Sequence, residues 1–117
     1  MSENVIDKEN ATYMSVTSAA TRTGDAIDTS FAGSLGLYAS IATNVDSAGT
    51  FTVEVYNPAS AGWSTYSGSS QTVTAGAAFT AEWEIAPVVS KFYRLKFTRT
   101  AGTSDAIVCS YIRRRGA

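Results

Sequence analysis

Two glutamates, Glu82 and Glu84, are the nearest approach to a catalytic pair in this chain of 117 residues. Paired carboxylates act as acid and base, or as acid and nucleophile, in glycoside hydrolysis. In the stretch AFTAEWEI, however, the two side chains are two residues apart on a predicted strand, and residues at this spacing lie on one face. Because the strand alone explains their proximity, we interpret them as part of a solvated face.

The other residue types that do chemistry are scarce. Histidine is absent and Cys109 is the single cysteine, which excludes Ser-His-Asp triads, Cys-His pairs, histidine-based zinc sites and internal disulfides. Cys109 follows a run of three apolar residues, so we expect a small buried side chain. The glycines form no GxxxxGK or GxGxxG phosphate loop. The sequence therefore predicts that the protein is not an enzyme and uses no cofactor.

Asp25 and Asp28 are the remaining candidates for a metal site. In the stretch GDAIDTS their carboxylates could give oxygen ligands to a calcium ion. Recognised calcium loops have a denser spacing of Asp and Asn, so we predict no metal site.

Aromatic residues offer a different chemistry, because an exposed ring is a flat platform for a sugar. Trp63 and Tyr66, in the stretch NPASAGWSTYSG, are the candidates for glycan binding, and Tyr56 and Tyr38 are further rings of this kind. The alternative is that these rings cover the edge of the core, as large aromatics commonly do. Trp83 lies on the apolar face of its strand, so we place it in the core.

Basic residues are concentrated late in the chain. The first ninety residues contain two basic and nine acidic residues, a net charge of −7, whereas the rest contain seven basic and one acidic, a net charge of +6. One interpretation is cross-strand pairing, in which the glutamates of AFTAEWEI face Arg94 and Lys96 on a neighbouring strand. This interpretation predicts that residues 78–85 and 91–99 lie side by side.

A second interpretation applies to Arg113, Arg114 and Arg115. Side chains alternate across a strand, so three consecutive arginines cannot all face one acidic strand. A terminal basic cluster favours an acidic protein surface or a nucleic acid as its partner. Because the isoelectric point is about 5.2, nucleic acid is not the expected partner. We therefore predict that these arginines contact another protein or further copies of this chain.

Apolar and polar residues alternate with a period of two along most of the chain, which is typical of strands with one buried and one exposed face. Glycine-containing turn sequences such as DSAGT and TAGTS separate the alternating runs. We therefore predict an all-β fold, an antiparallel β-sandwich of jelly-roll or Ig-like type with about seven or eight strands. The predicted strands cover residues 12–18, 35–42, 50–56, 62–66, 71–74, 78–85, 91–99 and 106–113, and residues 21–34 are predicted to form a long loop.

Residues 1–11 do not share this alternation. They are charged and polar, so we predict an extended N-terminal arm that is flexible or ordered by a partner, followed by one sandwich domain over residues 12–117. Asn4, Val5 and Ile6 are the arm residues that we expect to contact the partner. The arm has neither the pattern of a secretory signal nor that of a membrane span, so we expect synthesis in a cytoplasm and no membrane partner.

Three stretches carry a resemblance to a known class of proteins: the arm from Met1 to Ala11, the strand GTFTVEVYNPASAGW and the closing FYRLKFTRTAGTSDAIVCSYIRR. Together they resemble small β-sandwich virion proteins of tailed bacteriophages, in particular capsid decoration or cement proteins. The resemblance implies a virion protein, made in the host cytoplasm, that binds the major capsid protein or another virion protein and stabilises the assembled shell. Self-association on the particle is expected. The alternative function is a carbohydrate-binding or adhesion module of a phage tail or fibre.

Overall fold

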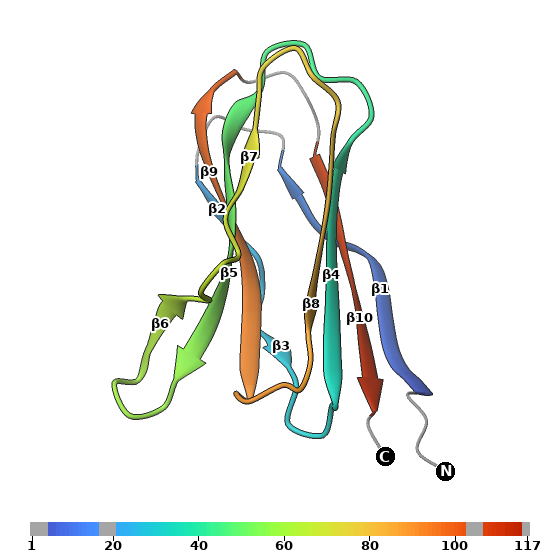
Figure 1. The fold of residues 1–117 in the computed structure, drawn as a ribbon, viewed down its shortest axis with the longest axis vertical. Coiled ribbons are helices and arrows are strands. Elements are labelled where there is room, and N and C mark those ends of the chain that lie inside the picture. The colour runs from blue at the N-terminus through green and yellow to red at the C-terminus, as the bar shows by residue number, and fades with distance from the viewer. Residues whose placement is uncertain (1–4, 17–20, 103–106, 116–117) are drawn as a thin grey trace.

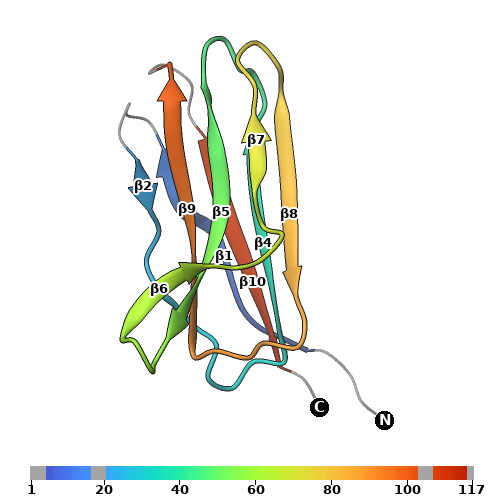
Figure 2. The same cartoon turned by 60° about the vertical axis from the view of Figure 1, so that its left-hand side comes forward.

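The chain forms two antiparallel β-sheets packed face to face in the computed structural model, which confirms the predicted all-β sandwich (Figures 1 and 2). The structure describes residues 5–16, 21–102 and 107–115, and these ranges contain strands and no helix. No membrane-crossing helix is therefore found in the described ranges. The strands are β1 (Val5–Val16), β2 (Arg22–Thr23), β3 (Ile27–Asp28), β4 (Ser34–Ile41), β5 (Ala48–Asn57), β6 (Gly62–Thr65), β7 (Gln71–Val73), β8 (Phe79–Ile85), β9 (Phe92–Ala101) and β10 (Ile107–Arg115).

Each of the eight predicted strands has a counterpart in the structure. One sheet has the strand order β1-β10-β4-β8, and the other has the order β2-β9-β5-β6, with β3 pairing with β9 and β7 pairing with β5. The described residues form ten strands, more than we predicted, because β2 and β3, of two residues each, lie within the predicted long loop 21–34. They complete the edge of the second sheet beside β9.

The core lies between the two sheets, where the alternating apolar residues of both meet. Phe51 of β5 is at its centre, with ring centroids 4.6 Å from Phe97, 5.6 Å from Phe79 and 5.8 Å from Trp83. Aromatic contacts of this kind add to the roughly 1.5–3 kcal/mol that burial of each large apolar side chain contributes. The other fully buried large side chains are Met14, Leu35, Leu37, Ile41, Val53, Ile85, Tyr93, Leu95 and Ile107.

Strand β1 corrects the prediction of an arm over residues 1–11. Residues 5–11 are part of β1 and pair with β10, beginning with Val5 opposite Arg115. The boundary that we predicted between arm and domain therefore falls inside a strand. Because β1 is an edge strand whose described side chains before residue 13 are mostly exposed, backbone pairing rather than an apolar face holds this first part of the strand in place. Residues 1–4, which include Asn4, lie outside the described residues.

The predicted pairing of the acidic and basic strands is wrong. β8 pairs with β4 and β9 pairs with β5, so these consecutive strands lie in different sheets. Glu82 and Glu84 therefore do not face Arg94 and Lys96. Arg94 instead pairs with Glu54 on β5, with 2.7 Å between Nε and Oε1.

Candidate functional site

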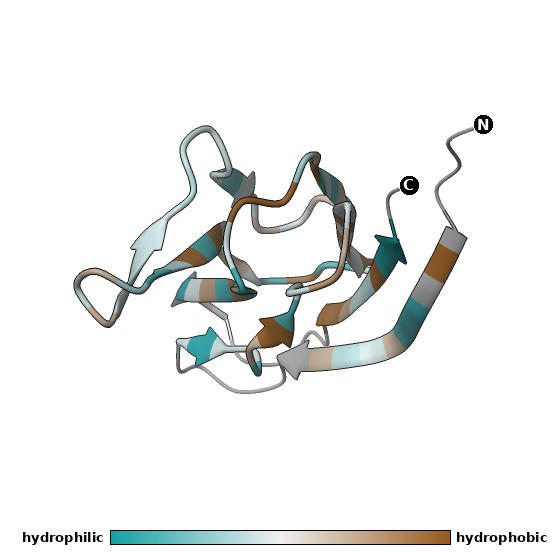
Figure 3. Cartoon of the chain, turned by 90° about the horizontal axis from the view of Figure 1, so that it is seen from below, coloured by the Kyte–Doolittle hydropathy of each residue, from teal (hydrophilic) through white to brown (hydrophobic). Residues whose placement is uncertain are grey.

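One end of the sandwich, here called the loop end, brings together the loops and strand ends that carry the predicted contact residues (Figures 1 and 3). It consists of residues 29–33 between β3 and β4, residues 86–91 between β8 and β9, the start of β1 and the end of β10. Figure 3 views the molecule from this end and shows hydrophobic coil segments among the loops. The loop end is therefore the first surface to consider for a partner.

Large apolar side chains are exposed at the loop end. Phe31 is 91% exposed and Val89 is 80% exposed, and Ile6 at the start of β1 is 51% exposed. The other two exposed large hydrophobics of the described residues are Val45 and Val108, which lie elsewhere. Neither Phe31 nor Val89 was among our predicted contact residues. The available signal was an apolar side chain inside a loop sequence, where nothing in the alternation assigns it a buried position.

Hydrogen bonds tie the two loops to each other. The Thr29 backbone N–H donates to the Lys91 carbonyl at 2.7 Å, and its hydroxyl donates to the Ser90 carbonyl at 2.6 Å. The Val88 N–H donates to the Gly33 carbonyl at 3.0 Å. Each loop therefore fixes the position of the other, and the exposed side chains project from a braced backbone rather than from free loops.

A buried tyrosine anchors the second loop to the core. The hydroxyl of Tyr93, whose side chain is fully buried, accepts hydrogen bonds from the N–H groups of Val89 and Ser90 at 2.9 and 3.2 Å. The Ser90 hydroxyl donates to the Tyr56 carbonyl at 2.7 Å. These hydrogen bonds to the core fix the backbone at Val89, whose side chain is exposed.

The structure brings together the described members of the predicted contact set. Val5 lies opposite Arg115, and Ile6 lies opposite Arg114, at the edge where β1 and β10 pair. The three arginines differ in role, as alternation requires. The Arg113 guanidinium donates to the backbone carbonyl of Asp28, so this residue braces the loop end from within.

Asp25 and Asp28 are the candidates for a calcium site, and the carboxylate of Asp28 is engaged in a local contact. The Asp28 carboxylate accepts the Ser30 N–H at 2.9 Å, and hydrogen bonds from Ser30 lower the pKa of this carboxyl. The Asp25 backbone carbonyl accepts the hydroxyl of Tyr13. Across the described ranges no three acidic or cysteine residues are grouped so as to hold a metal ion.

The predicted glycan platform is divided between the two faces of the second sheet. Trp63 lies on the outer face, opposite Tyr56, with ring centroids 5.6 Å apart. The Arg94 guanidinium lies 4.0 Å above the indole ring and so covers one of its two faces. Tyr66 does not join this group, because it packs against the core and contacts Tyr93. A sugar could stack only on the other face of the indole, and Tyr66 would not contribute to the platform.

Cys109 is fully buried, as predicted from its apolar neighbours. Burial raises the pKa of its thiol to about 12. At neutral pH the thiolate, which is the nucleophilic form, is therefore not populated.

Comparison with known proteins shows similarity of structure only. No protein-family model and no curated protein sequence matches the chain. The solved structures similar to it include the PBSX exported protein XepA, with a TM-score of 0.64 and 13% identity over 100% of this chain and 38% of that chain. A carbohydrate-binding module of the family 9 glycoside hydrolase Cel9A from Ruminococcus flavefaciens FD-1 has a TM-score of 0.48 and 12% identity, over 97% of this chain and 98% of that chain. The chain thus spans 38% of XepA, and at this identity the likeness shows a shared fold alone.

Proposed function

We propose that this protein is a structural component of a bacteriophage particle, most specifically a capsid decoration protein that docks on the assembled shell through its loop end. In this role it is made in the host cytoplasm, binds the major capsid protein or a neighbouring virion protein, and stabilises the particle. This role requires no catalytic group, because docking requires only a stable surface.

The observation that carries the proposal is the exposure of Phe31 and Val89 on two loops that brace each other. Burial of one such side chain at an interface contributes about 1.5–3 kcal/mol. Thr29 and Tyr93 already hold the two loops, so docking orders little additional backbone. Less of the free energy of burial is therefore offset by lost conformational entropy. An aromatic side chain that is displayed and preorganised, as Phe31 is, is a typical anchor residue of protein interfaces.

Two further features support a particle-bound role. The likeness of fold to XepA, an exported protein of phage PBSX, fits a phage origin. The exposed Arg115 ends β10 at the same end of the sandwich, where it adds a positive charge. On a symmetric shell many weak contacts of this kind add up through avidity.

A matched pair of valine variants tests the proposal. Val89 at the loop end and Val45 in the loop between β4 and β5 at the opposite end are both exposed, by 80% and 69%. Val89→Asp places a charge in the proposed interface, whereas Val45→Asp places the same charge outside it. The assay is co-sedimentation of each variant with undecorated heads of the phage that encodes the protein. We expect Val89→Asp and Phe31→Ala each to weaken binding to the heads at least about tenfold. Val45→Asp should bind like the wild type.

Two results would contradict the proposal. One is full decoration of the heads by Phe31→Ala and Val89→Asp with unchanged affinity. The other is equal loss of binding for the two valine variants, because this would show a general effect of charge rather than a specific surface.

A further inference from the structure

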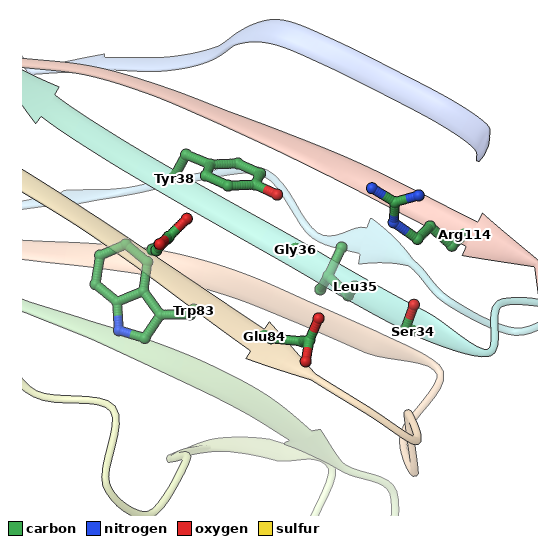
Figure 4. Close-up of a pocket in the computed structure, with 8 residues that line it drawn as sticks. Ser34, Leu35, Gly36, Tyr38, Trp83, Glu84 and Arg114 are labelled. Atoms are coloured by element: carbon green, nitrogen blue, oxygen red, sulfur yellow. The ribbon is translucent and has the colours of Figure 1, made fainter. Parts of the chain in front are cut away.

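The outer face of the four-stranded sheet contains a second candidate site, independent of the docking proposal. A hollow of about 320 Å³ lies over β4, β8 and β10. Polar and aromatic side chains line it, and Figure 4 shows them converging on one patch of the sheet. The residues that matter for recognition are Ser34, Gly36, Tyr38, Glu82, Glu84 and Arg114.

Strand register explains why these residues meet. Tyr38 on the middle strand β4 lies opposite Glu82 on β8, and Gly36 lies opposite Glu84. On the other side of β4, Arg114 of β10 lies opposite Ser34. Residues directly opposite each other in an antiparallel pair share a face of the sheet. The carboxylates therefore form one wall of the hollow and the guanidinium forms the other.

Gly36 makes room for the aromatic ring. A Cβ atom at this position would lie 2.8 Å from the hydroxyl oxygen of Tyr38, closer than side chains pack. The ring can therefore lie along β4, with its hydroxyl toward Gly36 and Arg114 (Figure 4). In this orientation Tyr38 is half-buried, and its ring is part of the lining of the hollow.

Among the described residues, the charged and phenolic side chains of the hollow have no partner. In the part of the chain that the structure describes, the side chains of Tyr38, Glu82, Glu84 and Arg114 take part in no hydrogen bond or ion pair. This differs from the opposite sheet, where Arg94 is paired with Glu54. Two carboxylate acceptors, one guanidinium donor and a phenol are thus available to a ligand at the same place.

We infer that this hollow binds a neutral pyranose unit of a glycan. Each sugar hydroxyl both donates and accepts a hydrogen bond, so adjacent hydroxyls satisfy the carboxylates on one wall and Arg114 on the other. The apolar C–H face of the ring stacks on Tyr38. Charges of both signs disfavour ligands that carry only one sign, because one wall would repel them. The volume lies at the lower end of the range for small-molecule sites.

This inference does not depend on the docking proposal. It also moves glycan recognition away from Trp63 and Tyr66, the residues that we predicted for it, to the opposite sheet. Tyr38, which the sequence offered only as a further ring, becomes the platform.

Titration with soluble sugars tests the inference. The probes are neutral oligosaccharides of glucose, galactose and N-acetylglucosamine, with sialyllactose as an anionic and glucosamine oligomers as a cationic comparison. We expect saturable binding of at least one neutral probe by calorimetry or NMR. Tyr38→Ala and Glu84→Gln should each weaken it at least about tenfold. Trp63→Ala, which removes a ring from the other sheet, should leave the affinity unchanged.

Gly36→Ala provides a second variant that removes no ligand-contacting group. Its Cβ displaces the Tyr38 ring, so we expect weakened sugar binding in a protein whose far-ultraviolet circular dichroism is native. Phe31→Ala should bind sugar normally, which separates this site from the docking surface.

The inference is overturned if no neutral probe binds, if only charged probes bind, or if Trp63→Ala rather than Tyr38→Ala abolishes binding. It is also overturned if no sugar binds and sedimentation shows a dimer that Tyr38→Ala dissociates, since the face would then be an interface between copies.

Discussion

Thr29→Val is the sharpest test of the idea that the two loops of the loop end brace each other. Thr29 is 1% exposed, and its hydroxyl donates to the Ser90 carbonyl at 2.6 Å. Valine has nearly the same shape but cannot donate this bond. The backbone bond from the Thr29 N–H to the Lys91 carbonyl remains.

The expected loss follows from the burial of this hydrogen bond. A buried acceptor left without its donor costs about 1–3 kcal/mol, and the added methyl group offsets part of this. We therefore expect the free energy of unfolding to fall by about 1–2 kcal/mol. For a domain near this size each kcal/mol corresponds to roughly 4 °C, so Tm should fall by about 4–8 °C.

Urea or thermal unfolding of Thr29→Val beside Thr98→Val measures the effect. Thr98 is exposed on β9, and its hydroxyl has no partner in the described ranges, so its substitution should change stability by less than about 0.5 kcal/mol. Hydrogen exchange should quicken at the Val88 amide, and binding to phage heads should weaken although Phe31 and Val89 are unchanged. Equal stability of the two variants would refute the argument that this bond braces the loops.

Three further predictions concern the scaffold. Because Glu54 and Arg94 form a partly buried ion pair, a double-mutant cycle with Glu54→Gln and Arg94→Met should give a coupling of about 1 kcal/mol, and a value near zero would contradict the pairing. Burial raises the pKa of Cys109 from about 9 to about 12, so the unfolded chain loses its thiol proton first, and stability should fall with a slope that approaches about 1.4 kcal/mol per pH unit as the pH rises above 9. Urea unfolding between pH 8 and 10 should show that Cys109→Ala lacks this slope. Gly102 and Gly68 both have positive φ, but a Cβ at Gly102 would lie 2.3 Å from a backbone carbonyl oxygen, whereas Gly68 has open space. Gly68→Ala should lower the free energy of unfolding by about 1–2 kcal/mol, and Gly102→Ala should lower it by more. Equal losses for the two variants would argue against a steric clash at Gly102.

The strands were predictable from the sequence because alternation of apolar and polar residues directly reflects one buried face. Their partners were not, because a period of two does not specify which strand lies alongside. The loop after Ile85 crosses to the other sheet, and so β8 and β9 do not pair. Residues 5–11 were misread for a related reason, since an edge strand held by backbone bonds needs no apolar stripe.

The candidate sites were predictable only in part. The sequence predicted that residues 113–115 contact a partner, which stays a prediction, and their alternation implied that they could not all face one way. It did not indicate Phe31 or Val89, because the exposure of a loop side chain depends on what the rest of the chain leaves uncovered. The hollow at Tyr38 depends on the register of three strands distant in sequence, which no local pattern contains.

The place of β10 has a consequence for how the protein is made. This strand lies between β1 and β4, although it is the last of the ten along the chain. A ribosome therefore releases β1, β4 and β8 before the strand that joins β1 to the others has emerged. Closing contacts between the most distant strands is slow, so the nascent polypeptide exposes apolar strand faces for an interval. A weakened β1–β10 pairing would therefore lengthen this interval and increase the dependence on chaperones during synthesis, as well as lower the stability of the finished sandwich.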